Sequence, residues 1–249
     1  MPTRAIVRPP GDTYPKALTR INPPPPIDMG LACEQHRAYV AALQACGLEV
    51  IDLPPDPERP DAVFVQDPVL VIDGCAIVCR PATESRQGEA DALVAVLRQA
   101  LPIVALREPA TLDGGDVLIT EDKLFVGLST RSNQAACEQL ARLTGRAVEG
   151  VPLPDGLLHL LSGCTYLGRN RLLVVSSLAP AFPRFEHLLV PDEEAAAANV
   201  LIIGRQAIVP EGYPRTAERV ERCGFAVHLV PSSEFEKRDG GVTCKALLF

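Results

Sequence analysis

The sequence lacks the features that would assign it to several broad classes of protein. Lys and Arg number 24 against 31 Asp and Glu, for a net charge of −7, and no dense basic cluster is present to follow a phosphate backbone. No apolar run approaches the ~18 residues of a membrane-spanning helix. The first residues, Met1 to Arg4, contain no apolar signal-peptide core. We therefore expect a cytoplasmic protein that binds neither nucleic acid nor a membrane.

The cysteines lack the arrangement of a structural metal site. The chain has eight of them, scattered in mostly apolar surroundings. Cys75 and Cys79 have a spacing that puts both side chains on one face of a strand, but no histidine or second cysteine pair completes a zinc set. Reduced, buried thiols are therefore the expectation for most of them.

What the sequence does contain is enough apolar material for a sizeable core. The 249 residues are 47% hydrophobic and 22% charged, as in an ordinary globular protein, and could form one large domain or two small ones. The chain end, residues 240–249, is apolar and β-prone, although such ends are usually frayed. We expect it to pair inside a sheet, which makes Cys244 a fixed position.

A strand–turn–strand pattern recurs at intervals of roughly 35 to 50 residues, a spacing typical of radial or stacked repeats. Hairpins are expected over residues 69–79, 117–126, 165–175 and 200–209, and helices over residues 29–46, 84–99, 132–144 and 214–223. Lone strands at residues 3–7 and 242–249 would pair as a fifth unit and leave no open edge. The pattern predicts a single α/β domain over residues 1–249, a ring closed by pairing of the N- and C-terminal strands.

Four reactive side chains lie where strands of these units begin: Asp67, Asp113, His159 and Cys244. In a ring such positions face the axis, so a thiol, an imidazole and two carboxylates would meet there as a nucleophile with an acid/base partner. The carboxylates favour a cationic, nitrogen-rich substrate such as a guanidinium, because a carboxylate can accept two of its N–H groups. A Cys/His/Asp metal site is an alternative reading of the same residues.

Other residues suit the ends of an amino-acid substrate. Arg86 and Arg131 could clamp a carboxylate, while Asp61 could hold an ammonium group. Residues 9–28 form a long proline-rich stretch without a period, and loops of this length are usually functional or disordered. Leu18 in this loop is a candidate lid contact.

Eight motifs occur in order along the whole chain: D-A-V-F-V-Q-D-P (61–68), R-P-A-T-E-S-R (80–86), L-D-G-G-D-V-L (112–118), V-G-L-S-T-R-S-N (126–133), L-H-L-L-S-G (158–163), A-A-N (197–199), G-Y-P-R-T (212–216) and K-R-D-G-G-V-T-C (237–244). Together they resemble the dimethylarginine dimethylaminohydrolases, within the guanidine-modifying (amidinotransferase/arginine deiminase) superfamily. The resemblance implies a five-bladed, pseudo-symmetric α/β propeller of ββαβ repeats. It also implies hydrolysis of asymmetric dimethylarginine or monomethylarginine to citrulline and dimethylamine or methylamine.

The resemblance implies a role for each candidate residue. Cys244 matches the nucleophile, His159 the general acid/base, and Asp113 the carboxylate that orients the histidine and holds guanidinium. The substrate-binding matches are Asp67 for the guanidinium, Asp61 for the α-amino group, Arg86 and Arg131 for the carboxylate, and Leu18 for a mobile lid. A covalent thiouronium intermediate is implied, with no metal or organic cofactor.

One position departs from the family pattern, and two other functions stay open. Gln66 stands where many family members have glutamate, which leaves the exact substrate open. Another guanidine hydrolase of the superfamily, similar to arginine deiminase, would share the fold, although such enzymes are typically longer. A non-catalytic ligand-binding module would keep the fold without needing the reactive residues. The expected partner is a small-molecule substrate, and a homodimer is compatible with the sequence.

Overall fold

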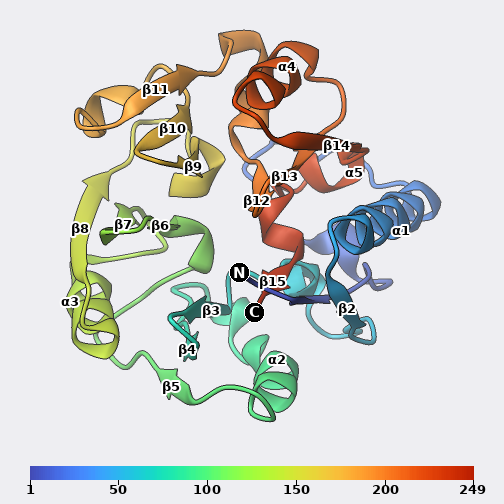
Figure 1. Ribbon diagram of the computed structural model, residues 1–249. Helices are drawn as coiled ribbons and strands as arrows, with labels where there is room; N and C mark the ends of the chain where they lie inside the picture. Colours follow the sequence, from blue (N-terminus) through green and yellow to red (C-terminus); the bar gives the residue numbers. More distant parts are fainter.

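The computed structural model describes the whole chain, residues 1–249, as five small sheets of three strands each. The sheets are β3 (Val69–Ile72), β4 (Cys75–Val78) and β5 (Ile103–Ala105); β6 (Val117–Ile119), β7 (Lys123–Leu128) and β8 (Ala147–Pro152); β9 (Cys164–Gly168), β10 (Arg171–Val174) and β11 (Glu186–Leu189); β12 (Leu201–Ile203), β13 (Gln206–Pro210) and β14 (Ala226–Val230); and β15 (Leu247–Leu248), β1 (Arg4–Val7) and β2 (Glu49–Asp52). The helices are α1 (Met29–Ala45), α2 (Ala90–Leu97), α3 (Gln134–Thr144), α4 (Pro214–Arg222) and the short α5 (Ser233–Glu236). Figure 1 shows the sheets grouped around a common centre, with α1 to α4 at the periphery.

One pairing pattern is repeated in all five sheets. The middle strand is antiparallel to one neighbour and parallel to the other. A parallel pair needs a crossover connection, and α1, α2, α3 and α4 each form part of one. In the remaining sheet the connection between β10 and β11 carries only a 3-10 turn, Ala179–Ala181. The ββαβ order implied by the family resemblance is therefore present, with one helix missing.

The expected hairpins form because their turn residues suit tight connections. Asp73 and Gly74 both have positive φ, 49° and 75°, which is the backbone form of the two-residue turn that joins β3 to β4. Side chains also cap the starts of two helices. The Asp28 side chain accepts a hydrogen bond from the backbone of α1, and the Asn133 side chain does the same for α3.

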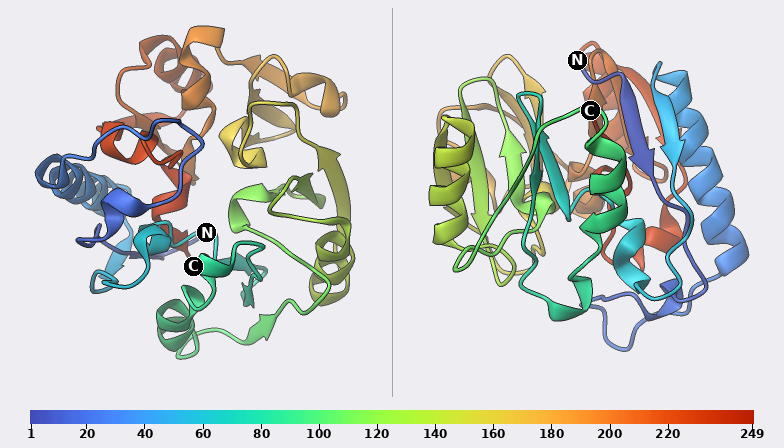
Figure 2. Two further views of the ribbon diagram at one scale, coloured as in Figure 1. Left: turned by 180° about the vertical axis from the view of Figure 1, so that it is seen from behind. Right: turned by 90° about the horizontal axis from the view of Figure 1, so that it is seen from below.

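The two ends of the chain lie side by side (Figures 1 and 2). Strands β1 and β15 are antiparallel, with Ala5 opposite Leu248 and Ile6 opposite Leu247. The backbone N–H groups of Thr3 and Arg4 both donate to the Phe249 carbonyl, each at 3.0 Å. The predicted pairing of the two terminal strands is confirmed.

Two predicted elements are wrong in extent. The helix expected over residues 84–99 is limited to α2, because Glu84–Arg86 is a 3-10 turn and Gly88 has a φ of +85° that a helix does not contain. The strand expected over residues 242–249 is limited to β15. Cys244 lies instead in a 3-10 turn, Thr243–Lys245, directly before that strand.

The apolar core is divided among five clusters that lie largely between neighbouring sheets. One of them combines residues of β3–β5 with residues of β6–β8, and another combines β1, α1 and β12–β14.

All eight cysteines are free thiols, four of them buried. No helix combines the length and the apolar character that crossing a membrane would need.

Candidate active site

The four reactive side chains come from equivalent places in four of the five sheets. Asp67 lies two residues before β3, and Asp113 directly precedes the 3-10 turn Gly114–Asp116 that leads into β6. His159 directly precedes the 3-10 turn Leu160–Ser162 that leads into β9, and Cys244 lies in the turn before β15. Each side chain is thus carried by a short irregular segment whose end is fixed by a strand. The fold therefore delivers residues that are far apart in sequence to one place.

Seven of the eight candidate residues line a single cavity of about 150 Å³: Leu18, Asp61, Asp67, Arg86, Arg131, His159 and Cys244. Asp113 does not line it but is bonded to two residues that do. Its Oδ2 lies 3.2 Å from Nε2 of His159 and accepts a hydrogen bond from Nη1 of Arg131 at 3.2 Å. All eight candidates therefore belong to one connected site.

His159 is surrounded by carboxylates. Burial, the largest influence, lowers its pKa, but Asp67, the hydrogen bond to Asp113, and Asp116 together outweigh burial and raise the pKa above its ordinary value. Asp116 accepts hydrogen bonds from Ser132 Oγ at 2.6 Å and from the Leu160 backbone N–H at 3.0 Å. The imidazole is therefore well suited to carry a proton near neutral pH.

Asp67 is held rigidly beside this histidine. Its Oδ1 accepts the Gly115 backbone N–H and its Oδ2 accepts Nη1 of Arg86, both at 2.9 Å. Burial raises its pKa, but the charges of Arg86 and His159 outweigh burial and lower the pKa below the usual range. A side chain at Gly115 would place its Cβ 2.8 Å from His159 Nδ1 and 2.9 Å from Asp67 Oδ1, so only glycine allows this approach.

Cys244 is 8% exposed and packs with apolar and aromatic side chains that include Tyr14, Phe64 and Phe235. Burial, followed by the negative charge of Asp67, raises the pKa of its thiol to about 12. The thiol is therefore protonated at neutral pH when no ligand is bound. A cation placed beside it would favour the thiolate.

Both arginines pair with the carboxylates of the site. Nη1 of Arg86 lies 2.9 Å from Asp67 Oδ2 and 3.7 Å from Asp113 Oδ2. Its Nε and Nη2 donate to Glu89 at 2.8–3.2 Å, so this guanidinium is buried among three carboxylates. Arg131 pairs with Asp113, whose other oxygen, Oδ1, is buried without a hydrogen-bond partner. Asp67 and Asp113 thus already bind one guanidinium, and Asp113 Oδ1 remains available as a hydrogen-bond acceptor.

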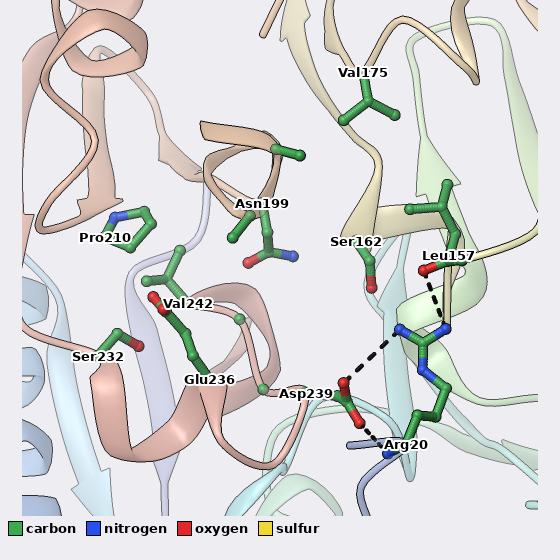
Figure 3. A pocket seen from close by; sticks show the side chains of 15 residues that line it. Arg20, Leu157, Ser162, Val175, Asn199, Pro210, Ser232, Glu236, Asp239 and Val242 are labelled. Carbon is green, nitrogen blue, oxygen red and sulfur yellow. Dashed lines mark hydrogen bonds and ion pairs between the residues drawn. The ribbon is translucent and has the colours of Figure 1, made fainter. Parts of the chain in front are cut away.

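The proline-rich loop covers the cavity. The Leu18 backbone N–H donates to Asp61 Oδ1 at 3.0 Å, and the Leu18 side chain is 39% exposed. The next contact is made by Arg20, whose backbone N–H donates to Asp239 Oδ2 at 2.7 Å and whose Nη1 donates to the Gly156 carbonyl at 3.1 Å. Figure 3 shows Arg20 bonded to Asp239 at the edge of a neighbouring pocket of about 250 Å³, which shares Arg20, Asp239 and Gly240 with the site.

Comparison with known proteins decides the family. A family model described as "N,N dimethylarginine dimethylhydrolase, eukaryotic" matches residues 25–152. The N(G),N(G)-dimethylarginine dimethylaminohydrolase of Pseudomonas aeruginosa is 39% identical over 228 residues, which cover 89% of this chain and 90% of that protein. The protein of the same name from Streptomyces coelicolor is 38% identical over 98% of this chain and 96% of its own length.

The chain belongs to the dimethylarginine dimethylaminohydrolase family. A solved cysteine-to-serine variant of the Pseudomonas aeruginosa enzyme, in complex with citrulline, superposes with a TM-score of 0.95 at 36% identity, and each chain is covered completely. The N-terminal domain of ArgZ, a cyanobacterial arginine dihydrolase, reaches a TM-score of 0.87 at 23% identity, over 98% of this chain and 96% of that one. That second likeness shows the fold alone.

Sequence reasoning missed several residues of this family member's site. Glu89 forms an ion pair with Arg86. Its position three residues after Arg86 could have suggested this pair, but the sequence predicted an ordinary helix there. Asp116 is the second aspartate of the D-G-G-D motif, and its contact with the segment after His159 had no local signal. Arg20 and Asp239 are far apart in sequence and meet only in the fold. No group of three or more His, Cys, Asp or Glu side chains is placed to hold a metal ion.

Proposed function

We propose that this chain hydrolyses Nω-methylated arginine to citrulline and dimethylamine or methylamine, through a covalent intermediate on Cys244. One observation carries the proposal. The Cys244 thiol, the His159 imidazole and the Asp67 carboxylate line one cavity, Asp113 is bonded to His159 behind it, and a resident guanidinium, that of Arg86, already lies against both carboxylates. The family membership agrees with this arrangement.

In the proposed complex the substrate guanidinium takes the place that the Arg86 guanidinium now occupies between Asp67 and Asp113. The unpartnered Oδ1 of Asp113 supplies an acceptor for an additional N–H group. Arg86 then turns with Arg131 toward the substrate carboxylate, while Asp61 binds the α-amino group. Leu18 closes over the ligand with its loop.

The positive substrate also prepares the nucleophile. Placed beside Cys244, it offsets the burial that raises the pKa of the thiol and favours the thiolate. The thiolate attacks Cζ, the bond from Cζ to the methylated nitrogen breaks, and protonated His159 gives its proton to the departing amine. Neutral His159 then takes one proton from water, and the water oxygen attacks the thiouronium carbon. The C–S bond breaks as the remaining hydroxyl proton passes to the departing sulfur, which releases citrulline and restores the Cys244 thiol.

We propose that the fold serves this chemistry as one catalytic domain, residues 1–249. The five sheets would close as a five-bladed propeller, in which β15 and β1 complete the last blade. The support for closure is the pairing of the two chain ends together with the grouping of sheets in Figure 1. The proposed partner is the small-molecule substrate, with the enzyme acting in the cytoplasm.

Citrulline release from asymmetric dimethylarginine, monomethylarginine and arginine tests the function. We expect turnover of the methylated substrates, its loss in Cys244→Ser with an unchanged circular dichroism spectrum, and full activity in the control Cys33→Ser, which replaces a thiol of α1 outside the site. Full activity of Cys244→Ser would disprove the mechanism. Turnover of arginine alone would identify a deiminase instead.

A further inference from the structure

Gln66 is hydrogen-bonded both to Cys244 and to Gly114, the residue after Asp113. It lies directly before Asp67, between the 3-10 turn Pro60–Val63 and β3. Its backbone N–H donates to the Cys244 carbonyl at 3.2 Å. Its side-chain Nε2 donates to the Gly114 carbonyl at 2.9 Å. One residue thus bonds to two of the chain segments that supply the proposed catalytic groups.

The approach between Gln66 and the Gly114 turn is unusually close. A Cβ on Gly114 would lie 2.2 Å from the Gln66 carbonyl oxygen, so the two backbones touch where no side chain fits. The Gly114 N–H also donates to the Asp67 carbonyl at 2.9 Å. With the bond from the Gly115 N–H to Asp67 Oδ1, three hydrogen bonds therefore join this turn to residues 66 and 67, and one of them depends on the Gln66 side chain.

Only a donor can make the side-chain bond. The Gly114 carbonyl is an acceptor, so the amide must present its Nε2 there, which leaves its Oε1 buried without a partner. Gln66 does not line the cavity. Its contacts are with backbone that holds catalytic side chains, and not with the space that a substrate would fill.

We infer that Gln66 is a positioning residue, which acts as a hydrogen-bond donor to fix the Asp113 turn relative to Asp67 and Cys244. The inference deepens the proposed function and assumes the catalytic roles given there. A shift of these carboxylates by a fraction of an ångström would misplace the substrate guanidinium, and misplacement of about 1 Å can cost roughly 100-fold in rate.

If residue 66 were a glutamate, its ability to donate a hydrogen bond to the Gly114 carbonyl would depend on pH, whereas that of the amide does not. A neutral carboxyl can donate to the Gly114 carbonyl, whereas an ionised one places two acceptors against it. Neighbouring charges also affect its ionisation. The titratable groups in the segments that flank residue 66 or bond to it are Asp61, Asp67, Asp113, Asp116, Cys244 and Lys245, and Arg86 and His159 contact two of these aspartates. Burial and the aspartates favour the neutral carboxyl, whereas Arg86 and a protonated His159 favour the ionised one, so both forms are reached as the pH is varied.

Gln66→Glu and Gln66→Met therefore form a matched pair. We expect Gln66→Met, which cannot donate, to lose about 10- to 100-fold in kcat at every pH with little change in KM. We expect Gln66→Glu to approach wild-type kcat at acidic pH and to lose activity as the pH rises, adding a limb to the kcat profile that wild type and Gln66→Met lack. Profiles of wild-type shape for Gln66→Glu, or unchanged kcat for Gln66→Met, would overturn the inference.

Alkylation of Cys244 by iodoacetamide separates this inference from the proposed function. The alkylation rate reports the placement of Cys244 without any substrate turnover. We expect the rate of Gln66→Glu to depart from that of wild type only at higher pH, and the rate of Gln66→Met to depart at all pH values. If wild type released no citrulline, the proposed function would fail while these rates still tested the positioning role; rates identical to wild type in both variants would refute it. Because the two pH regimes of Gln66→Glu are compared in one folded protein, the test does not depend on the stability of Gln66→Met.

Discussion

Replacing Lys245 with methionine is expected to change how the stability of this protein depends on pH. Lys245 follows the proposed nucleophile and is fully buried. Its Nζ donates to Ser232 Oγ at 3.1 Å and lies 4.4 Å from the ring centroids of both Tyr39 and Phe235, and it forms no ion pair with a carboxylate. Burial lowers the pKa of this lysine from 10.5 to about 7.

The sign and size of the effect follow from that shift. A base whose pKa is lowered by folding contributes stability above its unfolded pKa, and this contribution is lost as the pH falls to the folded pKa. The fall from 10.5 to about 7 corresponds to about 5 kcal/mol, at about 1.4 kcal/mol per pH unit. Each ring stabilises the charged form by about 1 kcal/mol, which reduces the expected change to about 3 kcal/mol.

Urea unfolding between pH 6.5 and 10 measures this change. We expect the free energy of unfolding of Lys245→Met minus that of wild type to be most positive near pH 6.5 and to decrease by about 2 kcal/mol by pH 10, because the last part of the change lies above the unfolded pKa of 10.5. The lost hydrogen bond to Ser232 adds an offset that does not vary with pH in this way. Lys16→Met, at an exposed lysine, is the control and should give a difference independent of pH. A difference for Lys245→Met that is equally flat would refute the reasoning.

Three further predictions concern the site and the terminal strands. Asp67→Asn removes the carboxylate that contributes most to raising the pKa of His159, so NMR titration should find a lower pKa for the His159 ring than in wild type. An unchanged pKa would show that Asp67 does not act on His159. Arg131→Ala should raise KM for dimethylarginine by about 10-fold or more, with a smaller fall in kcat, because a charged hydrogen bond to the substrate carboxylate is lost; a fall in kcat alone would contradict the clamp. Removal of residues 247–249 deletes β15 but keeps Cys244. Because the edge of β1 is then exposed, the melting temperature should fall by several degrees. An unchanged melting temperature would show that the terminal pairing is dispensable.

The hairpins were predictable because their signals are local. Short apolar runs on both sides of a turn such as Asp73-Gly74 predict a strand pair without reference to the rest of the chain. The site positions were predictable for a related reason. Asp67, Asp113 and His159 each stand just before the first strand of a repeat, so the repetition itself suggested that they converge.

Other features depended on distant parts of the chain. In four of the five sheets the sequence pattern did not predict the third, parallel strand, since β8 and β14, for example, contain exposed and half-buried residues with a weak apolar signal. The helix expected over residues 84–99 failed at Gly88, whose backbone conformation lets Arg86 reach inward to Glu89 and Asp67. The ion pair of that guanidinium with Asp67, a residue outside the segment, is a contact that local helix propensity does not include.

The sequence alone determined the repeat, the pairing of the chain ends and the identity of the reactive side chains, because spacing and residue type carry that information. Only the tertiary structure decided which groups those side chains meet. It placed Cys244 in a turn and not in a strand, set Arg86 against the acid pair, and made Gln66 a donor to Gly114. Such contacts depend on distances between segments that are remote in sequence, and charges and hydrogen bonds act only over those distances.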